Sequence, residues 1–153
     1  MVALALVALC LSCGSISAYD DSDKEVEQAF NHFIAAFNNL DWDLFRKTLA
    51  DDVSVFNPDI PETPSVNRLD GRELVEAGFK SVFAATREKT SGPPYLHIMP
   101  KNVHIQKYND SAIVTFEFER EGNSLGRRTI IFHRESVGWK IVHIHASNVA
   151  RRN

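Results

Sequence analysis

Three histidines lie close together in the last part of the sequence. His143 and His145 alternate along one predicted strand, and His133 belongs to the strand before it. Alternate residues of a strand project from one face, so the three imidazoles could gather and bind zinc. The same face would also carry residues suited to subunit packing, namely Thr129, Ile131, Trp139 and Ile141. We therefore interpret the three histidines and Trp139 as a homodimer interface, keep zinc binding as the alternative, and predict no metal cofactor.

His97 and Asp59 are the pair we consider for proton transfer. A histidine titrates near neutral pH and can move protons when a carboxylate orients it. Asp59 belongs to a proline-rich segment, residues 57–68, which we interpret as a loop at the mouth of a pocket. The alternative is that His97 is a core histidine without a catalytic role.

Further polar residues stand at the ends of apolar rows on the predicted sheet. Arg128 and Asn148 occupy such positions, and Tyr95 lies in a loop that could reach the same pocket. The apolar row itself would present Ile130, Phe132 and Ile144. An apolar pocket with few polar groups suits a small apolar or aromatic ligand. The alternative for Arg128 is a solvated strand end.

Composition limits the function further. The chain has 153 residues and a formal net charge of -3, with no basic run long enough for a phosphate-binding stripe. Nucleic acid is therefore not an expected partner. The sequence also lacks a Ser-His-Asp, P-loop or dinucleotide signature, and we predict no cofactor.

Residues 1–18 contain no charged side chain and have the pattern of a signal peptide. The apolar run from Val2 to Leu11 is shorter than the roughly 20 residues needed to span a bilayer. Cleavage after Ala18 would leave a secreted or periplasmic domain, residues 19–153, without either cysteine. The alternatives are a lipid anchor at Cys13 and a buried N-terminal element.

Helical spacing of apolar residues predicts three helices before the sheet. They cover about residues 22–39, a short stretch capped by Asp41, and a stretch that starts near Asp70 and ends before Ser91. We expect these helices to turn the following residues inward: Val26, Phe30, Phe33, Ile34, Phe37, Leu44, Phe45, Leu74, Val75, Phe79, Val82 and Phe83. Gly78 within the third helix indicates close packing of the backbone.

Four antiparallel strands are predicted after Tyr95, joined by three turns. The turns are centred on Asn109-Asp110, on Gly122-Asn123-Ser124 and on Ser136-Val137-Gly138. We expect the following pairs: Ile105 with Val114, Val103 with Phe116, Phe116 with Ile130, Val114 with Phe132, and Glu119 with Arg127. Asn109-Asp110-Ser111 is also a glycosylation sequon, although the turn alone explains Asn109.

The segment from Trp139 to Ser147, WKIVHIHAS, sorts into two selective faces. Strict alternation places Val142, Ile144 and Ala146 on the apolar face and the histidines on the other. A strand with two selective faces belongs in the middle of a sheet. We therefore predict an α+β fold in which the helices cover the face that carries Val142 and Ile144.

This segment, together with Phe132-His133-Arg134, resembles the C-terminal signature of SnoaL-like domains in the nuclear transport factor 2-like superfamily. Within it, the chain is similar to the association, or hub, domain of calcium/calmodulin-dependent protein kinase II. The likeness covers roughly residues 23–148. It implies a cone-shaped α+β barrel, with three N-terminal helices on a strongly bent antiparallel sheet, and dimerisation through the sheet.

The resemblance leaves three functions open. The superfamily includes isomerases, dehydratases and non-enzymatic assembly domains, so the fold does not decide among them. The hub domain has cavity arginines where this chain has Ile130 and Ala146, so affinity for small carboxylates is not expected to carry over. The Tyr and Asp pair of steroid isomerases has no matching residues. We favour a secreted, dimeric small-molecule binder; an isomerase or dehydratase using His97 and Asp59, or a pure assembly module, are the alternatives.

Overall fold

The computed structural model describes residues 21–57 and 68–150. The predicted leader with Cys10 and Cys13 lies outside these residues, as does Asp59. No helix in the described part of the chain is long and apolar enough to cross a bilayer.

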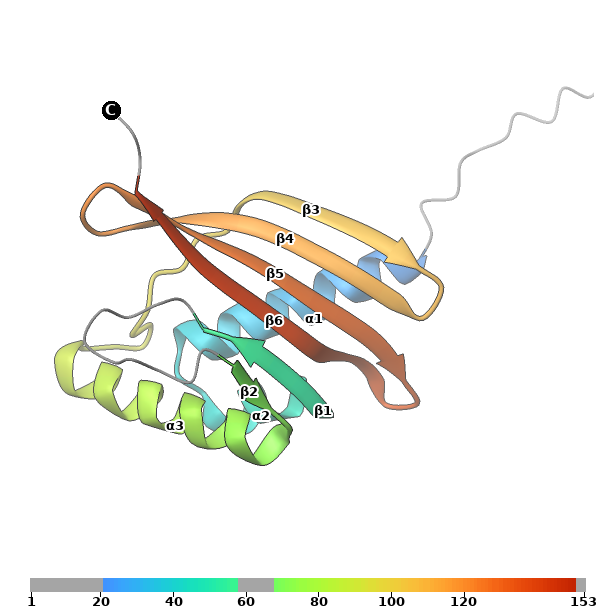
Figure 1. Cartoon of the computed structure of the whole chain (residues 1–153), viewed down its shortest axis with the longest axis horizontal. Coiled ribbons are helices and arrows are strands. Elements are labelled where there is room, and N and C mark those ends of the chain that lie inside the picture. Colours follow the sequence, from blue (N-terminus) through green and yellow to red (C-terminus); the bar gives the residue numbers. More distant parts are fainter. Residues whose placement is uncertain (1–20, 58–67, 151–153) are drawn as a thin grey trace, which may run out of the picture.

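Three helices and six strands make up an α+β fold in this part of the chain (Figure 1). The helices are α1 (Asp21–Asn38), α2 (Trp42–Lys47) and α3 (Arg72–Lys89). The strands are β1 (Leu49–Phe56), β2 (Arg68–Asp70), β3 (Lys101–Tyr108), β4 (Ser111–Arg120), β5 (Ser124–Glu135) and β6 (Gly138–Ala150). They form one sheet in the order β2-β1-β6-β5-β4-β3. The four strands predicted after Tyr95 are antiparallel as expected, but the sheet as a whole is mixed, because β1 pairs with β6 in parallel.

Aromatic side chains pack the three helices against one another. The Phe37 ring of α1 lies 5.9 Å from the Phe79 ring and 5.5 Å from the Phe83 ring, both on α3. Edge-to-face pairs at this spacing add stability beyond burial alone. Phe45 of α2 is fully buried in the same cluster. These contacts confirm the predicted apolar faces except at Leu44, Leu74 and Val82, which are exposed.

Two predictions about the helices, the cap at Asp41 and the close packing at Gly78, are confirmed. The Asp41 side chain accepts a hydrogen bond from the Leu44 amide at 3.0 Å and caps α2, as predicted. A Cβ on Gly78 would lie 2.8 Å from the Leu69 side chain, which confirms the close packing there. By contrast, α3 begins after Gly71, and its N-terminus has no side-chain cap.

The strand registers are partly those predicted. Ile105 lies opposite Val114 as expected, but the ladder shifts before His104 and leaves Val103 exposed. Between β4 and β5 the predicted register is wrong by two residues. The observed pairs are Val114 with Ile130, Ala112 with Phe132, Phe116 with Arg128 and Glu117 with Arg127. A shift of two residues keeps every side chain on its predicted face.

The loop between these strands explains the difference. It consists of residues 121–123, and Ser124 already belongs to β5, where its hydroxyl donates to the Glu121 carbonyl at 2.9 Å. Gly122 and Asn123 both adopt positive φ, at 71° and 54°. Both residue types tolerate this conformation, so the turn forms one position earlier than the composition suggested.

A β-bulge in β6 corrects the predicted faces of the central strand. Ile131 pairs with His143 and Phe132 pairs with Ile141, so Val142 has no partner on β5. Trp139 and Ile141 therefore face the core, with exposed fractions of 8% and 0%, whereas Val142 is half-buried on the opposite side. Beyond the bulge Ile144 and Ala146 face the core, as predicted. An extra residue exchanges the two faces of a strand at that point.

Trp139 is consequently part of the core and does not share a face with the histidines. Its indole N–H donates to a Glu25 carboxylate oxygen of α1 at 3.4 Å. The Arg134 guanidinium, which also binds Glu25 at 2.6 Å, lies 5.7 Å from the Trp139 ring. The residue therefore has little surface to offer a partner subunit.

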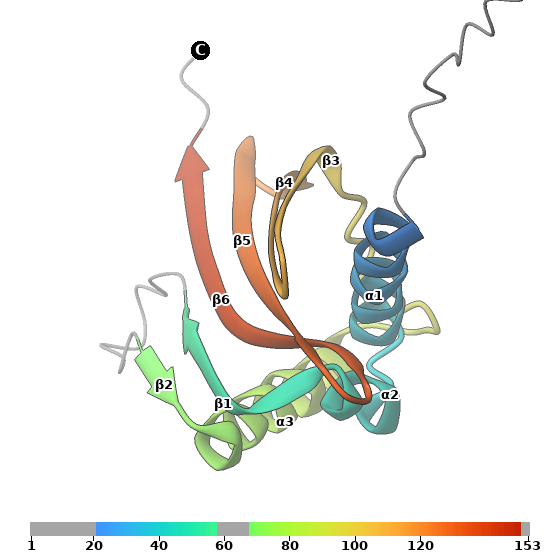
Figure 2. The ribbon, with the colours of Figure 1, turned by 90° about the vertical axis from the view of Figure 1, so that its right-hand side faces the viewer.

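The sheet that contains the bulge is strongly curved. Figure 2 shows β5 and β6 bending sharply, with α1 on the inner side of the bend. The other face of the sheet carries no helix in the described structure. The inner face is apolar, and the outer face carries His143 and His145.

Deleting Val142 should be far more damaging than truncating it. We expect Val142→Ala to lower the free energy of unfolding by about 1 kcal/mol or less, because the side chain is half-buried. Deletion would expose Trp139 and Ile141 or Ile144 and Ala146, at a loss of roughly 3–6 kcal/mol. Urea denaturation followed by circular dichroism measures both values. Equal losses would show that the bulge does not determine the faces.

Candidate functional site

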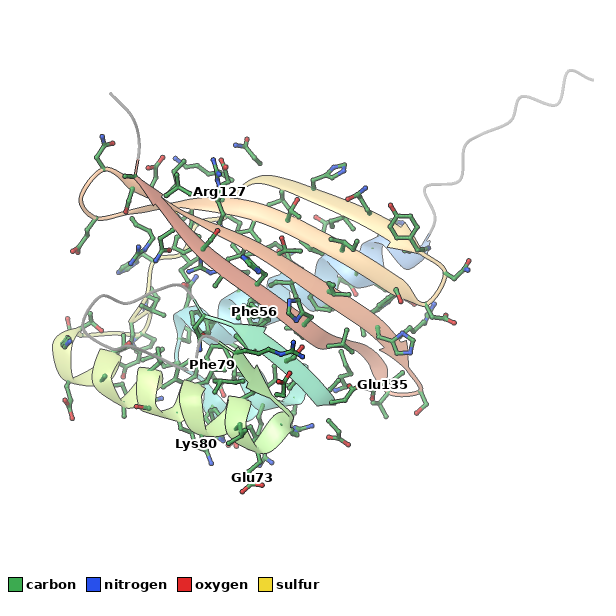
Figure 3. All side chains as sticks on the ribbon, viewed as in Figure 1. Phe56, Glu73, Phe79, Lys80, Arg127 and Glu135 are labelled. Carbon is green, nitrogen blue, oxygen red and sulfur yellow. The ribbon has the colours of Figure 1, made fainter. Side chains whose placement is uncertain are left out.

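A cavity of about 300 Å³ lies between the inner face of the sheet and helices α1 and α3. Among the described residues its wall is almost wholly apolar and contains Phe33, Ile34, Phe37, Val55, Asn57, Leu69, Gly78, Phe79, Val82, Ile98, Phe116, Phe118, Arg128, Ile130, Ile144 and Ala146. Phe79 extends from α3 toward the sheet, while its neighbour Lys80 lies on the other side of the helix (Figure 3). The volume is at the lower end of the range for small-molecule sites.

Two rows of residues across the sheet form the floor of this cavity. In the first, Val55, Ile144 and Ile130 pair across β1, β6 and β5. The second row lies two residues further along β6, where Ala146 pairs with Arg128 and Arg128 pairs with Phe116.

Asn57 extends the second row on the β1 side. It follows Phe56, the last paired residue of β1, which lies opposite His145. Asn57 and Arg128 therefore flank the small side chain of Ala146, and they are the only two polar side chains in the described cavity wall.

Arg128 is a charged group held against an apolar wall. One of its terminal nitrogens, Nη1, donates to the Ser147 carbonyl at 3.0 Å and to the Arg127 carbonyl at 2.8 Å. The guanidinium carbon lies 4.9 Å from the centre of the Phe118 ring, within cation–π range. Burial, and then the positive charge of Arg120, lower the pKa of Arg128 to about 10. The side chain is therefore still charged at neutral pH.

Gly126 allows the Phe118 ring to take this position. The two residues pair across β4 and β5, and a Cβ on Gly126 would lie 2.4 Å from the Phe118 ring. The ring therefore lies flat across the glycine and supports the Arg128 guanidinium from below. A larger residue at position 126 would push the ring into the cavity.

The predicted ligand-binding residues divide into two groups. Arg128, Ile130 and Ile144 line the cavity. Phe132 is fully buried in the core but is not part of the cavity wall. Tyr95 packs partly buried near the C-terminal end of α1, where its amide donates to the Asn38 carbonyl, and Asn148 is exposed near the end of β6.

The predicted catalytic pair finds no support in the described residues. His97 is exposed and does not line the cavity, and Asp59 lies outside the described residues. Asn38 explains the orientation of this segment, because its side chain donates to the Ile98 carbonyl at 3.0 Å and accepts from the Ile98 amide at 2.9 Å. These bonds fix Ile98 against α1, and Ile98 rather than His97 reaches the cavity.

The histidines lie on the outer face of the sheet, as predicted. The His143 Nδ1 atom is 2.9 Å from the Ser54 hydroxyl, and burial together with the nearby His145 lowers the pKa of His143. His145 is exposed beside Phe56. His133 lies in a different row, opposite Lys140. Among residues 21–57 and 68–150, no three His, Cys, Asp or Glu side chains come together as a metal site requires.

Several cavity residues were not identified from the sequence as parts of a site. Asn57 was assigned only to a loop, and Phe118 was not singled out. Ala146 was matched to a cavity position of the hub domain but was not proposed as a binding residue. The apolar spacing of α1 and α3 identified Phe33, Phe37 and Phe79 as buried but could not show that they border an open space. Positions that line a cavity and positions that fill a core have the same pattern.

A second, more open hollow of about 580 Å³ lies between α1, α2 and the β5–β6 turn. Its wall mixes charged residues such as Glu25, Lys47 and Arg134 with the exposed Leu44 and Val137. It is less enclosed and more polar than the first cavity. A small apolar ligand would therefore be better shielded from water in the first cavity.

Comparison with known proteins gives a consistent result for most of the chain. Residues 26–151 match the family model described as a SnoaL-like domain. No protein of curated function matches the sequence significantly.

Similar solved structures include proteins of differing description. A candidate dehydratase of the NTF2-like family from Streptomyces avermitilis is 24% identical, with a TM-score of 0.69 over 86% of this chain and 99% of that one. A candidate calcium/calmodulin-dependent protein kinase type II association domain from Thiobacillus denitrificans is 27% identical, with a TM-score of 0.63 over 80% and 94%. A candidate ketosteroid isomerase from Parabacteroides distasonis is 20% identical, with a TM-score of 0.60 over 80% and 86%.

The contact between Gly126 and Phe118 yields a prediction about stability. Gly126→Ala should lower the free energy of unfolding by about 1–3 kcal/mol, because the added methyl group displaces the ring. In a Phe118→Leu background the same substitution should have less than half this effect, since two residues in contact do not act additively. Urea denaturation of the four proteins measures the coupling. Additive effects would contradict the proposed packing.

Proposed function

The chain belongs to the SnoaL-like domain family, and we propose that it binds a small, largely apolar molecule in the cavity between α1, α3 and the sheet. The observation that carries this proposal is the apolar cavity of about 300 Å³ whose described polar side chains, Asn57 and Arg128, lie in one row. An apolar wall supplies affinity through burial, and a few polar groups fix the orientation of the ligand.

Binding without catalysis is the form of this function that we favour. General acid–base chemistry needs a group that exchanges protons near neutral pH within hydrogen-bond reach of the substrate. The described cavity wall contains no histidine and no carboxylate, and the pKa of Arg128, about 10, leaves it protonated. The similar structures described as a dehydratase and an isomerase support the shared fold, which hosts both enzymes and binding proteins.

An assembly module with a vestigial cavity is the weaker alternative. In such a protein, large side chains would be free to fill the space between helix and sheet. Here Gly78 and Ala146 are small residues in the wall, and the cavity is open. These features favour a binding role.

We also propose that the outer face of the sheet pairs two copies of the chain. Two rows in register cross this face, Ile113–Ile131–His143–Ser54 and Thr115–Thr129–His145–Phe56. Across β4, β5, β6 and β1 neither row contains a carboxylate, a lysine or an arginine, and depletion of charge is typical of the centre of an interface. The rows end at edge strand β2 in Asp70 and Arg68, which form an ion pair with each other at 2.8 Å. Arg127 at the upper edge and Phe56 nearer the centre are labelled in Figure 3, which looks onto this face.

Secretion is a separate part of the proposal. It rests on the sequence pattern of residues 1–18, which lie outside the described structure. A mature chain that begins at Tyr19 would contain the whole described fold. N-terminal sequencing of protein recovered from the medium or the periplasm tests this expectation directly.

Filling the cavity should weaken binding strongly without unfolding the protein. We expect Ala146→Leu to weaken binding of the neutral fluorescent probe N-phenyl-1-naphthylamine by about tenfold or more, because the new side chain occupies the floor of the cavity. The free energy of unfolding should fall by no more than about 1 kcal/mol, because the added carbons enter existing space. Fluorescence titration and urea denaturation give the two values.

Ala35→Leu is the matched control, since Ala35 is exposed on α1 outside this cavity. It should bind the probe as the natural sequence does. Equal binding by the Ala146→Leu protein, or no binding by any of the three proteins, would contradict the proposed function. Native mass spectrometry of the purified natural protein can also reveal a retained small molecule.

A charge on the outer face should weaken the dimer. We expect Ile131→Lys to raise the dimer dissociation constant by about tenfold or more, because the interface would bury an unpaired ammonium group. Val137→Lys is the control, since Val137 lies in the β5–β6 turn and is 74% exposed. Sedimentation velocity across a range of concentrations measures both. A natural protein that remains monomeric at high concentration would remove the dimer proposal.

A further inference from the structure

Arg128 carries a positive charge that nothing in the described structure neutralises. Its side chain lines the cavity, and no carboxylate among residues 21–57 and 68–150 forms an ion pair with it. The neighbouring Arg127 differs in this respect, because it binds Glu117 at 3.2 Å on the outer face. The Arg128 side chain is half-buried, so part of its charge has lost contact with water without gaining an opposite charge, which is unfavourable.

The Arg128 guanidinium is hydrogen-bonded to the protein on one side, and its other edge is available to a ligand. Nη1 donates to the carbonyls of Arg127 and Ser147 and so fixes the group against the sheet. Nε and Nη2 have no acceptor among the described residues. Together they form the edge of a guanidinium that binds both oxygens of a carboxylate side by side.

Resting on the proposed function, we infer that the ligand is a small apolar carboxylic acid whose carboxylate binds the Nε and Nη2 edge of Arg128. The hydrocarbon part would occupy the remainder of the cavity, against the phenylalanine rings of α1 and α3.

The second row of the cavity floor provides the space for this group. Arg128 and Asn57 stand on either side of Ala146, and neighbouring strands are about 4.8 Å apart. A carboxylate above the Ala146 methyl group would therefore lie between the guanidinium and the Asn57 amide. Asn57 has no hydrogen-bond partner among the described residues, so its amide N–H can donate to the second oxygen.

Two further features favour an anion at this point. In addition to burial, the positive charge of Arg120 lowers the pKa of Arg128, and it would also attract the carboxylate of the ligand. The Phe118 ring, held over Gly126, supports the guanidinium at 4.9 Å and limits its movement. A preorganised donor loses less freedom on binding than a mobile surface arginine.

Matched pairs of acids and amides test the inference. The probes are 2-naphthoate with 2-naphthamide, 4-phenylbutyrate with 4-phenylbutyramide, and octanoate with octanamide. Each pair has nearly the same shape and differs in charge. Isothermal titration calorimetry at neutral pH on the full chain should show at least one acid binding about 10- to 100-fold more tightly than its amide.

Substitutions then assign the effect to Arg128. In Arg128→Met the acid should bind no more tightly than the amide, while amide affinity should change less than about threefold. Arg128→Lys should restore part of the preference, because lysine keeps the charge but lacks the two-donor edge. Arg127→Met is the control with the same change in net charge, and it should keep the full preference. Thermal unfolding verifies that each protein is folded, and Arg128→Gln replaces Arg128→Met if the latter is not.

The outcomes separate this inference from the proposed function. Equal binding of acid and amide in every pair would overturn the carboxylate inference and leave small-molecule binding intact. A preference for the acid that persists in the folded Arg128 variant would overturn the assignment to Arg128. Failure of all six probes and of N-phenyl-1-naphthylamine to bind would overturn the proposed function itself.

Discussion

Val142 has no partner on β5, and this one unpaired residue determines which side chains of the central strand face the helices. Before it, Trp139 and Ile141 enter the core; after it, Ile144 and Ala146 do. Without the bulge, one of these pairs would lie on the outer face beside the histidines. β5 and β6 also bend around α1 (Figure 2). The side chains that line the inner face of this curved sheet therefore depend on the bulge.

The cavity follows from that bend together with a few small residues. Gly126 lets the Phe118 ring lie flat, Ala146 leaves space on the floor, and Gly78 allows α3 to approach Leu69 closely. Large aromatic side chains from α1 and α3 close the other side. Against this apolar background Arg128 stands out, because its half-buried guanidinium has no carboxylate partner among the described residues. A residue that is unfavourable in the empty protein and useful in the complex is common at functional sites.

Sequence reasoning succeeded where the signal was local. The Asp41 cap, the turn at Asn109 and the close packing at Gly78 each depend on residues near in sequence, and all three are present. The parallel pairing of β1 with β6 could not be predicted in this way, since it joins residues about ninety positions apart. The register error between β4 and β5 was invisible to patterning, because a shift of two residues preserves both faces.

The errors within the site have similar physical causes. Alternation applies only to an unbroken strand, so Trp139 was placed on the wrong face by a bulge that leaves no mark in composition. His97 was chosen for the chemistry of its side chain, but it lies in a segment without regular structure, where hydrogen bonds between Asn38 and Ile98 set the orientation. Arg128 was identified because it stands at the end of an apolar row. That no described residue pairs with its charge became visible only once its neighbours were placed.

The position of the bulge can be measured directly in solution. In a methyl-labelled sample, nuclear Overhauser spectra should connect the Ile141 methyl groups to the Phe132 ring. The Val142 methyl groups should show contacts only with residues of the outer face. Contacts between Val142 and the Phe132 ring, with Ile141 oriented toward the histidines, would contradict the account of the inner face and of the cavity built on it.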